Sequence, residues 1–411
     1  MTIHADLRQV IYALSDALDL VGVDDVAHGK RVGVMSAECA KAMRWPQDEV
    51  LFVFDLGVLH DIGVSSTKVH QHLVNEFDWA GSQEHAQLGG ALIQDFAPLA
   101  RMAQPIRYHH TRWDVMQREG VPRDVALHAN LILLMDRVDA MAAPYYASGK
   151  VLQQRKYFQN EIAQRKGTYF AESLVDAFIS VSSHEAFWLL LEPRPLNSYL
   201  QDMLAMGHPY EASTQELRQL AEIFARIVDA KSPFTATHSR GVARVARTLA
   251  ELMGVSADNC DKLEIAGLLH DLGKLRIPDE VLDKPAKLEE EERMIINTHS
   301  FETMQILKNI QGFDDIRSWA ANHHEEPQGR GYPYGLEGAD LALEARILRV
   351  ADIFQAMVQD RPYRKGLSNA AVDEFMAQLQ REGKIEAQIG VAIHANLDAL
   401  VKAAKGDVSV R

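Results

Sequence analysis

The chain has little of several features that would assign it to common classes of protein. Only two of its 411 residues are cysteines, Cys39 and Cys260, and they form no CxxC pair. Such sparse cysteine argues against a disulfide framework and favours a reducing compartment, so we expect a cytoplasmic protein. No stretch reaches the roughly 20 apolar residues of a membrane helix. The first residues, MTIHADLRQV, do not place a basic flank before an apolar run, so no secretory signal is expected.

Positive charge is also in deficit. The formal net charge is -14 and the isoelectric point is near 5.6, which disfavours a general affinity for polymeric nucleic acid or for an anionic membrane surface. The sequence lacks a P-loop, a Rossmann glycine fingerprint and a GxSxG nucleophile elbow, so kinase, dehydrogenase and esterase functions have no support. With 47% hydrophobic residues, the chain nevertheless has enough apolar material for folded cores.

What the chain does contain is an internal repeat. The segment LRQVIYALSDALDL near the N-terminus resembles LRQLAEIFARIVDA, which lies 210 positions later. In each copy a histidine precedes a His-Asp pair by 32 residues, His28 before His60 and His238 before His270. Self-similarity at a fixed spacing is the signature of a repeated structural unit.

The repeat predicts two domains of one fold, residues 1–205 and 206–411. We expect the boundary in EPRPLNSYLQDMLAMGHPYEAST, where Ser213 and Glu216 have the spacing of a capping box for the next helix. Most other segments repeat apolar residues at intervals of three and four, and no alternating strand pattern is convincing. The fold class expected is therefore all-α, with two tandem helical domains.

Seven histidine and aspartate side chains of the second copy are candidate metal ligands. Asp271 directly follows His270, and a carboxylate with two oxygens can bridge two cations while imidazoles fill the other positions. Two cations about 3.5–4 Å apart lower the pKa of a shared water and stabilise an in-line displacement at phosphorus, which favours a phosphodiester substrate. With Asp271 shared, the other ligands divide by their order into two sets: His238, His270 and Asp352, and His299, His323 and His324.

This region resembles the HD superfamily of metal-dependent phosphohydrolases and, more specifically, the HD-GYP family. The resemblance rests on HDLGK, HHEEPQGRGYP, ADIFQAM and DRPYR, in that order, and covers the whole second domain. It implies hydrolysis of cyclic di-GMP to linear pGpG, to GMP or to both in bacterial second-messenger signalling, with cyclic GMP-AMP as the substrate that some members prefer. The first domain resembles an HD domain without GYP.

The family pattern implies roles for further residues. Lys274 matches a phosphate-contacting lysine, and the substrate-proximal loop is matched by Gly331, Tyr332 and Pro333. A phosphate or a guanine edge could be met by Arg361, Arg364 and Lys365, because a guanidinium makes paired hydrogen bonds to either; the alternative is a solvated helix end. Some members carry a glutamate of a third metal site where this chain has Phe234, so two metals are expected.

The identity of the metals and the exact activity stay open. Imidazole and carboxylate ligands suit iron, manganese, cobalt, nickel and zinc, of which we expect iron or manganese. The second domain could instead bind a cyclic dinucleotide or a partner protein without hydrolysis, or act on another nucleotide as other HD phosphohydrolases do. The asymmetry of the two halves suggests regulation, and a homodimer or a signalling-protein partner stays open.

The first copy keeps the pattern of candidate metal ligands but lacks the other motifs of the family. Val64 stands where the second copy has Lys274, and the segment after the histidine pair, HHTRWDVMQREG, has no GxGYP. Hydrolysis of a cyclic dinucleotide is therefore not expected there. Three interpretations remain, namely a metal-bearing sensor or regulatory domain, a second phosphohydrolase for another substrate, and a structural scaffold. The candidate ligands of this second metal site are His28, His60, Asp61, His85, His109, His110 and Asp136.

Overall fold

The computed structural model describes residues 3–22, 27–75, 81–207, 209–232, 237–360 and 365–406. In these ranges every regular element is a helix, and the only β-type pairings are isolated bridges. The prediction of an all-α fold is therefore confirmed. None of the helices in the described ranges combines the length and the apolar character that a membrane crossing requires.

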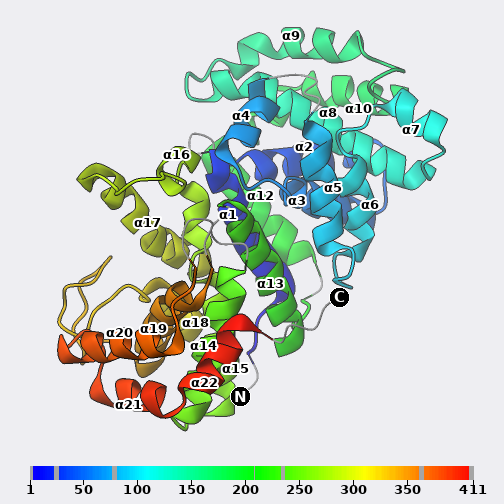
Figure 1. The fold of residues 1–411 in the computed structure, drawn as a ribbon. Coiled ribbons are helices and arrows are strands. Elements are labelled where there is room, and N and C mark those ends of the chain that lie inside the picture. The colour runs from blue at the N-terminus through cyan, green and yellow to red at the C-terminus, as the bar shows by residue number, and fades with distance from the viewer. Residues whose placement is uncertain are drawn as a thin grey trace. The chain divides into compact units, whose positions relative to one another are not determined.

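The chain divides by its contacts into two units (Figure 1). The N-terminal unit is Leu18–Pro209, and the C-terminal unit is Tyr210–Arg411 together with Met1–Ala17. The first residues join the C-terminal unit through backbone hydrogen bonds, in which Ala212 N donates to Ala5 O at 3.0 Å and Leu7 N donates to Tyr210 O at 2.8 Å. The functional division expected at residue 206 stays a prediction.

The N-terminal unit is built from helices of very different length, of which α8 is the longest and forms part of the core. Its elements are η1 (Leu20–Gly22), α2 (His28–Ala42), α3 (Gln47–Leu59), α4 (Thr67–Asn75), α5 (Ser82–Ile93), η2 (Ala100–Met102), α6 (Ala103–Tyr108), α7 (Trp113–Glu119), α8 (Arg123–Tyr146), α9 (Val151–Ala163), α10 (Glu172–Ser182), α11 (Glu185–Leu189) and α12 (Pro193–Met206).

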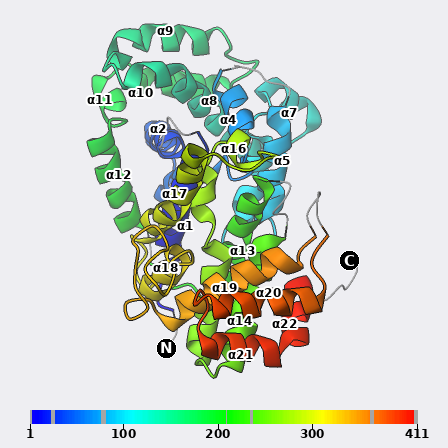
Figure 2. The same cartoon turned by 60° about the vertical axis from the view of Figure 1, so that its left-hand side comes forward.

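The C-terminal unit contains most of α1 (Leu7–Asp19) and all the helices after residue 210. In Figure 2, α19, α21 and α22 lie next to α14. The elements are α13 (Thr214–Ala230), α14 (His238–Leu252), α15 (Ala257–Leu269), η3 (Leu272–Arg276), α16 (Asp279–Leu282), α17 (Glu290–Leu307), α18 (Asp314–Ala321), α19 (Leu343–Val358), α20 (Asn369–Arg381), α21 (Ala387–Ala395) and α22 (Leu397–Lys405).

Local sequence explains where α13 begins and which face it buries. Ser213 and Glu216 form the expected capping box, with the Ser213 hydroxyl accepting from Glu216 N at 3.2 Å and Ser213 N donating to Glu216 Oε2 at 2.9 Å. The helix then buries one apolar face, including Leu217, Leu220 and Phe224, in the core.

The two units repeat the same close helix pair. In the N-terminal unit a Cβ on Gly57 of α3 would lie 2.6 Å from Gly33 Cα of α2. In the C-terminal unit a Cβ on Gly267 of α15 would lie 2.8 Å from Ala243 Cα of α14. These glycines let the helix backbones approach each other closely. Both pairs place a histidine at the start of one helix and a His-Asp sequence at the end of the other.

Candidate metal centre

The seven candidate ligands of the C-terminal unit come from helix ends and from two helix interiors. His238 is the first residue of α14, His270 caps α15, and the histidine pair follows α18. The helices α17 and α19 contribute His299 and Asp352. The buried members of the set are His238, His270, Asp271, His299 and His323, and the remaining two are partly buried.

The two oxygens of Asp271 face different imidazoles. Oδ1 lies 3.5 Å from His299 Nε2 and 3.9 Å from His323 Nε2. Oδ2 lies 3.2 Å from His270 Nε2. This arrangement suits a carboxylate that bridges two cations, with one oxygen directed to each.

Backbone carbonyls determine which ring nitrogens are free to bind a metal. The Nδ1 atoms of His270, His299 and His323 lie 2.6–2.8 Å from the carbonyl oxygens of Gly267, Ile296 and Ala320. A carbonyl oxygen only accepts, so each Nδ1 carries the proton and a neutral ring has its lone pair on Nε2. The Nε2 atoms of His299 and His323 then face each other at 3.4 Å.

The electrostatics of the site keep most of these groups in the form that binds metal. Burial lowers the pKa of His299 to about 4 and that of His324 to about 3, and it holds the pKa of His323 well below its ordinary value. These imidazoles are therefore uncharged at neutral pH. Burial acts in the opposite direction on Asp271, but His270 and Lys274 outweigh it and hold the pKa of this carboxyl well below its usual range.

The residues present fit divalent metal ions. Among the described residues, His270 Nε2 and Asp271 Oδ1 are buried polar atoms that form no hydrogen bond, which is costly unless another ligand satisfies them. Mixed imidazole and carboxylate donors are typical of zinc, iron, manganese, cobalt and nickel sites. Ligand atoms converge within 4.8 Å in three sets: His238, His270 and Asp352; His299, His323 and His324; and His270, Asp271 and His323. The assignment of individual ligands stays a proposal.

Three residues that sequence reasoning missed position these ligands. Thr303 Oγ1 accepts from Gly273 N at 3.0 Å and donates to His270 O at 3.1 Å, which ties α17 to the His-Asp turn. Asp229 accepts from the Ser239 hydroxyl at 2.7 Å and thereby fixes the first turn of α14. Glu325 is buried next to the histidine pair. Only Glu325 had a local signal, since an acid directly follows the two histidines.

Glu325 organises the loop expected to meet the substrate. Its carboxylate accepts hydrogen bonds from the backbone N–H groups of Tyr334, Gly335 and Leu336, at 2.7, 3.2 and 3.0 Å. A Cβ on Gly331 would lie 2.3 Å from Glu325 Cα, so only glycine permits this approach. The loop consequently folds back over the histidine pair.

The loop brings an aromatic ring to the metal ligands. Tyr332 stacks on His324 with ring centroids 4.7 Å apart and an interplanar angle of 29°, and Tyr332 N donates to His324 O at 3.3 Å. Pro333 follows in the same loop and is partly buried. Lys365 is exposed, whereas the predicted substrate contacts Arg361 and Arg364, and the Phe234 position, lie outside the described residues.

Lys274 lies against the bridging carboxylate. Its ammonium Nζ is 2.6 Å from Asp271 Oδ2, and the side chain is 21% exposed. Burial would lower the pKa of Lys274, but Asp271 and Asp352 raise it above its ordinary value. The lysine therefore carries a positive charge beside the ligand cluster.

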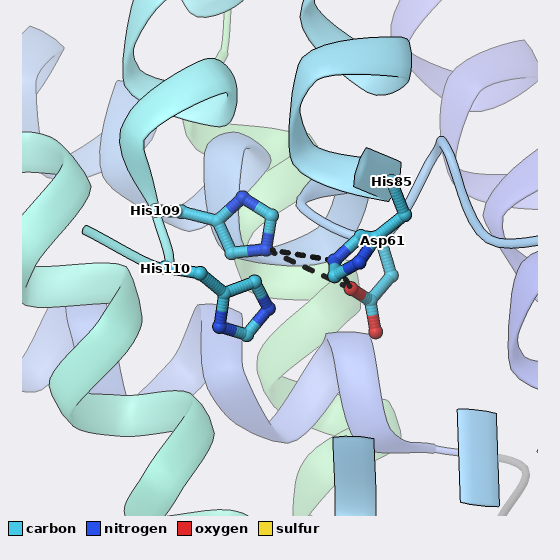
Figure 3. A group of neighbouring side chains, drawn as sticks. All are labelled: Asp61, His85, His109 and His110. Atoms are coloured by element: carbon cyan, nitrogen blue, oxygen red, sulfur yellow. Dashed lines mark hydrogen bonds and ion pairs between the residues drawn. The ribbon is translucent and has the colours of Figure 1, made fainter. Parts of the chain in front are cut away.

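The seven candidate ligands of the N-terminal unit are also brought together. Asp61, which follows His60 at the end of α3, points toward His85 of α5 and toward the histidine pair after α6 (Figure 3). Its Oδ1 lies 3.3 Å from His85 Nε2 and 3.8 Å from His109 Nε2. His28 Nε2 lies 3.4 Å from Asp136 Oδ1 and 3.9 Å from Asp61 Oδ2.

Comparison with known proteins places this geometry in a family context. A family model described as an HD domain matches residues 222–388. The 3'3'-cGAMP-specific phosphodiesterase 1 of Vibrio cholerae is 37% identical over 397 residues, which are 94% of this chain and 90% of that protein. The cyclic di-GMP phosphodiesterase response regulator RpfG of Xanthomonas campestris is 36% identical over 191 residues, which are 45% of this chain and 50% of that protein.

A solved structure shares the fold over both units. It is described as a cyclic GMP-AMP-specific phosphodiesterase of V. cholerae, and it matches with a TM-score of 0.64 and 24% identity. The match covers 97% of this chain and 98% of the other. At this identity the likeness is one of fold.

Proposed function

The chain belongs to the HD-domain family of phosphodiesterases, and from this premise we propose that its C-terminal unit hydrolyses a cyclic dinucleotide. The observation that carries the proposal is the position of Asp271, whose two oxygens face separate imidazoles within a buried cluster. The competing interpretation is a module that binds a cyclic dinucleotide without hydrolysing it. Such a module would not need seven candidate metal-binding side chains beside a lysine.

For the substrate we favour the mixed dinucleotide 3'3'-cGAMP. The relative that is similar over 94% of this chain carries that specificity in its name. The sequence motifs alone had placed cyclic di-GMP first, and it stays the second candidate because RpfG, which matches 45% of this chain, is named for it. Both are ring-closed phosphodiesters, so the chemistry required of the site is the same.

Two divalent cations bound by the C-terminal ligands would lower the pKa of a shared water and offset negative charge on the phosphoryl oxygens. We favour iron or manganese for both positions. Lys274 contributes a fixed ammonium that can hold a non-bridging phosphate oxygen once Asp271 is engaged by the cations. Tyr332, held over His324, presents its ring edge and hydroxyl to a base or ribose of the substrate.

The loop geometry leads to a first prediction. Gly331→Ala should lower turnover roughly 10- to 100-fold, because the new Cβ collides with the Glu325 backbone and a displacement of Tyr332 by about 1 Å is costly for a positioned substrate. Metal content should not change. Gly338→Ala is the matched control, because its Cβ would meet nothing closer than 3.4 Å. Equal activity of both variants would show that the loop does not position substrate.

Substrate choice is tested by comparing kcat/KM for 3'3'-cGAMP, cyclic di-GMP and cyclic di-AMP with one preparation of the full chain. We expect 3'3'-cGAMP to be hydrolysed fastest, with a linear dinucleotide as the first product. A higher kcat/KM for cyclic di-GMP would replace our substrate assignment and leave the phosphodiesterase activity intact. Cytoplasmic location and a homodimer or signalling partner stay predictions from the sequence.

A further inference from the structure

The N-terminal unit contains a cluster of four side chains whose geometry closely repeats one half of the C-terminal site. The ligand atoms of Asp61, His85, His109 and His110 all lie within 4.8 Å of one another, and their side chains point toward a common centre (Figure 3). His85 and His109 are 4% and 0% exposed. The cluster ties together the end of α3, the helix α5 and the end of α6.

Two of the three distances between these ligand atoms match those of a tetrahedral cation site. Bonds of about 2.0–2.1 Å to nitrogen and oxygen require ligand atoms about 3.3–3.4 Å apart in an ideal tetrahedron. His85 Nε2 lies 3.4 Å from His109 Nε2 and 3.3 Å from Asp61 Oδ1, and the third edge, from His109 Nε2 to Asp61 Oδ1, is 3.8 Å. The equivalent edges in the C-terminal unit are 3.4, 3.5 and 3.9 Å.

Some ligand atoms of the cluster are left without a hydrogen-bond partner. His109 Nδ1 donates to Ile106 O at 2.6 Å, so its Nε2 presents a lone pair to the centre. In the part of the chain that the structure describes, Asp61 Oδ1 and His110 Nε2 are buried and make no bond of hydrogen-bond geometry. Buried acceptors that converge in this way repel one another unless a cation lies between them.

The other half of the N-terminal site differs from its C-terminal counterpart. Asp352 belongs to a convergent ligand set with His238 and His270. The corresponding set among the described residues of the N-terminal unit is His28, His60 and Asp61, which does not include Asp136 and shares Asp61 with the first cluster. The Oδ2 atom of Asp136 instead accepts from Arg137 Nη2 at 2.9 Å and Nε at 3.2 Å. The residue after Asp352 is Ile353, so the position equivalent to Arg137 carries no charge in the C-terminal unit.

Arg137 is suited to replace a metal ion. Its side chain is 5% exposed, and a guanidinium keeps its charge at all working pH values. Lys274, the cation of the other site, contacts the bridging Asp271 instead, and its side chain is 21% exposed. A buried guanidinium fixed on Asp136 neutralises the carboxylate that a second cation would need.

His28 is oriented by a second buried ion pair, which does not decide the metal count. Its Nδ1 lies 2.8 Å from Asp139 Oδ2, and Asp139 also accepts from Arg31 Nε at 2.7 Å and from the Tyr146 hydroxyl at 2.7 Å. An aspartate in this position would hold the ring equally well with or without a metal on Nε2. The difference between the units therefore rests on Arg137.

We propose that the N-terminal unit binds one divalent transition-metal ion through Asp61, His85, His109 and His110, with Arg137 in place of a second cation. A single ion does not provide the pair of cations by which the C-terminal site would activate a shared water, so we assign this ion a structural role. The bound ion would cross-link α3, α5 and α6 and stabilise this unit.

The test is a metal count by mass spectrometry on the full chain purified anaerobically, and it does not depend on turnover. Asp61→Ala/His85→Ala should lose one metal equivalent per chain relative to wild type, and the milder Asp61→Asn should lose the same equivalent with the fold retained by circular dichroism. Loss of none, or of two, would overturn the proposal.

Arg137→Ile, which copies Ile353 of the other unit, provides the reciprocal measurement. Removing the guanidinium should allow a second ion to bind, so this variant should gain one equivalent when loaded with Mn²⁺ or Zn²⁺. An unchanged count in a folded Arg137→Ile protein would show that the arginine does not replace a cation. Chelation should also lower the melting temperature of wild type more than that of Asp61→Asn.

Discussion

Replacing Asp271 with alanine should reduce hydrolysis of the cyclic dinucleotide by about 10³-fold or more. A metal centre supplies several kcal/mol of transition-state stabilisation, and each 1.36 kcal/mol corresponds to a factor of ten in rate. The oxygens of Asp271 face imidazoles on both sides, with Oδ1 toward His299 and Oδ2 toward His270. Its loss should therefore weaken both metal positions, which a metal count on the variant would measure.

Two controls separate this effect from misfolding and from the other unit. Asp271→Ala leaves Lys274 without its carboxylate partner, so Asp271→Asn, which keeps an acceptor for the ammonium, should be measured beside it. Asp61→Ala removes the equivalent residue of the N-terminal unit and should keep turnover within about twofold of wild type. A folded Asp271→Ala protein with wild-type turnover would remove Asp271 from the mechanism.

Replacing Lys274 with valine should separate metal binding from catalysis. Valine is the residue at the equivalent position, Val64, of the N-terminal unit. We expect kcat to fall roughly 10²- to 10³-fold, as when one preorganised donor to a developing anion is removed. Metal content should be retained, because the lysine is not a ligand and its loss removes a positive charge from beside the cations.

The substitution Lys274→Arg refines this prediction. An arginine keeps the charge but spreads it over a larger planar group, so it should restore part of the lost activity and leave metal content unchanged. If Lys274→Val lost metal together with activity, the lysine would act through Asp271 and not on the substrate. Full activity with full metal content would mean that the ammonium only neutralises Asp271 in the metal-free protein.

Much of the C-terminal site could be predicted because its ligands recur in the sequence at fixed spacings. The 32-residue interval from His238 to His270 and the later histidine pair are visible in the sequence itself, without knowledge of three-dimensional contacts. The capping box at Ser213 was predictable for the same reason, since both partners lie within a single helical turn. Helical periodicity likewise sufficed for the fold class.

Other features depend on contacts between distant segments and left no local signal. The repeat suggested that Met1–Ala17 belongs with the first copy, yet these residues cluster with the C-terminal unit through backbone bonds near Tyr210. Thr303 resembles any threonine on a helix until it meets the Gly273 backbone 30 residues away. Arg137 could be read as an ordinary cation beside an aspartate, and only its burial against Asp136 reveals a difference between the sites.

The central claim, that the C-terminal cluster is a phosphodiesterase centre, is tested most directly by one assay. The full chain is purified anaerobically, its metal content is measured, and it is incubated with 3'3'-cGAMP and with cyclic di-GMP in the presence of Mn²⁺ or Fe²⁺ while products are separated by chromatography. We predict a linear dinucleotide from the wild type and none above background from Asp271→Ala. If wild-type protein with two metals in the C-terminal unit converts neither substrate, the proposed activity is contradicted.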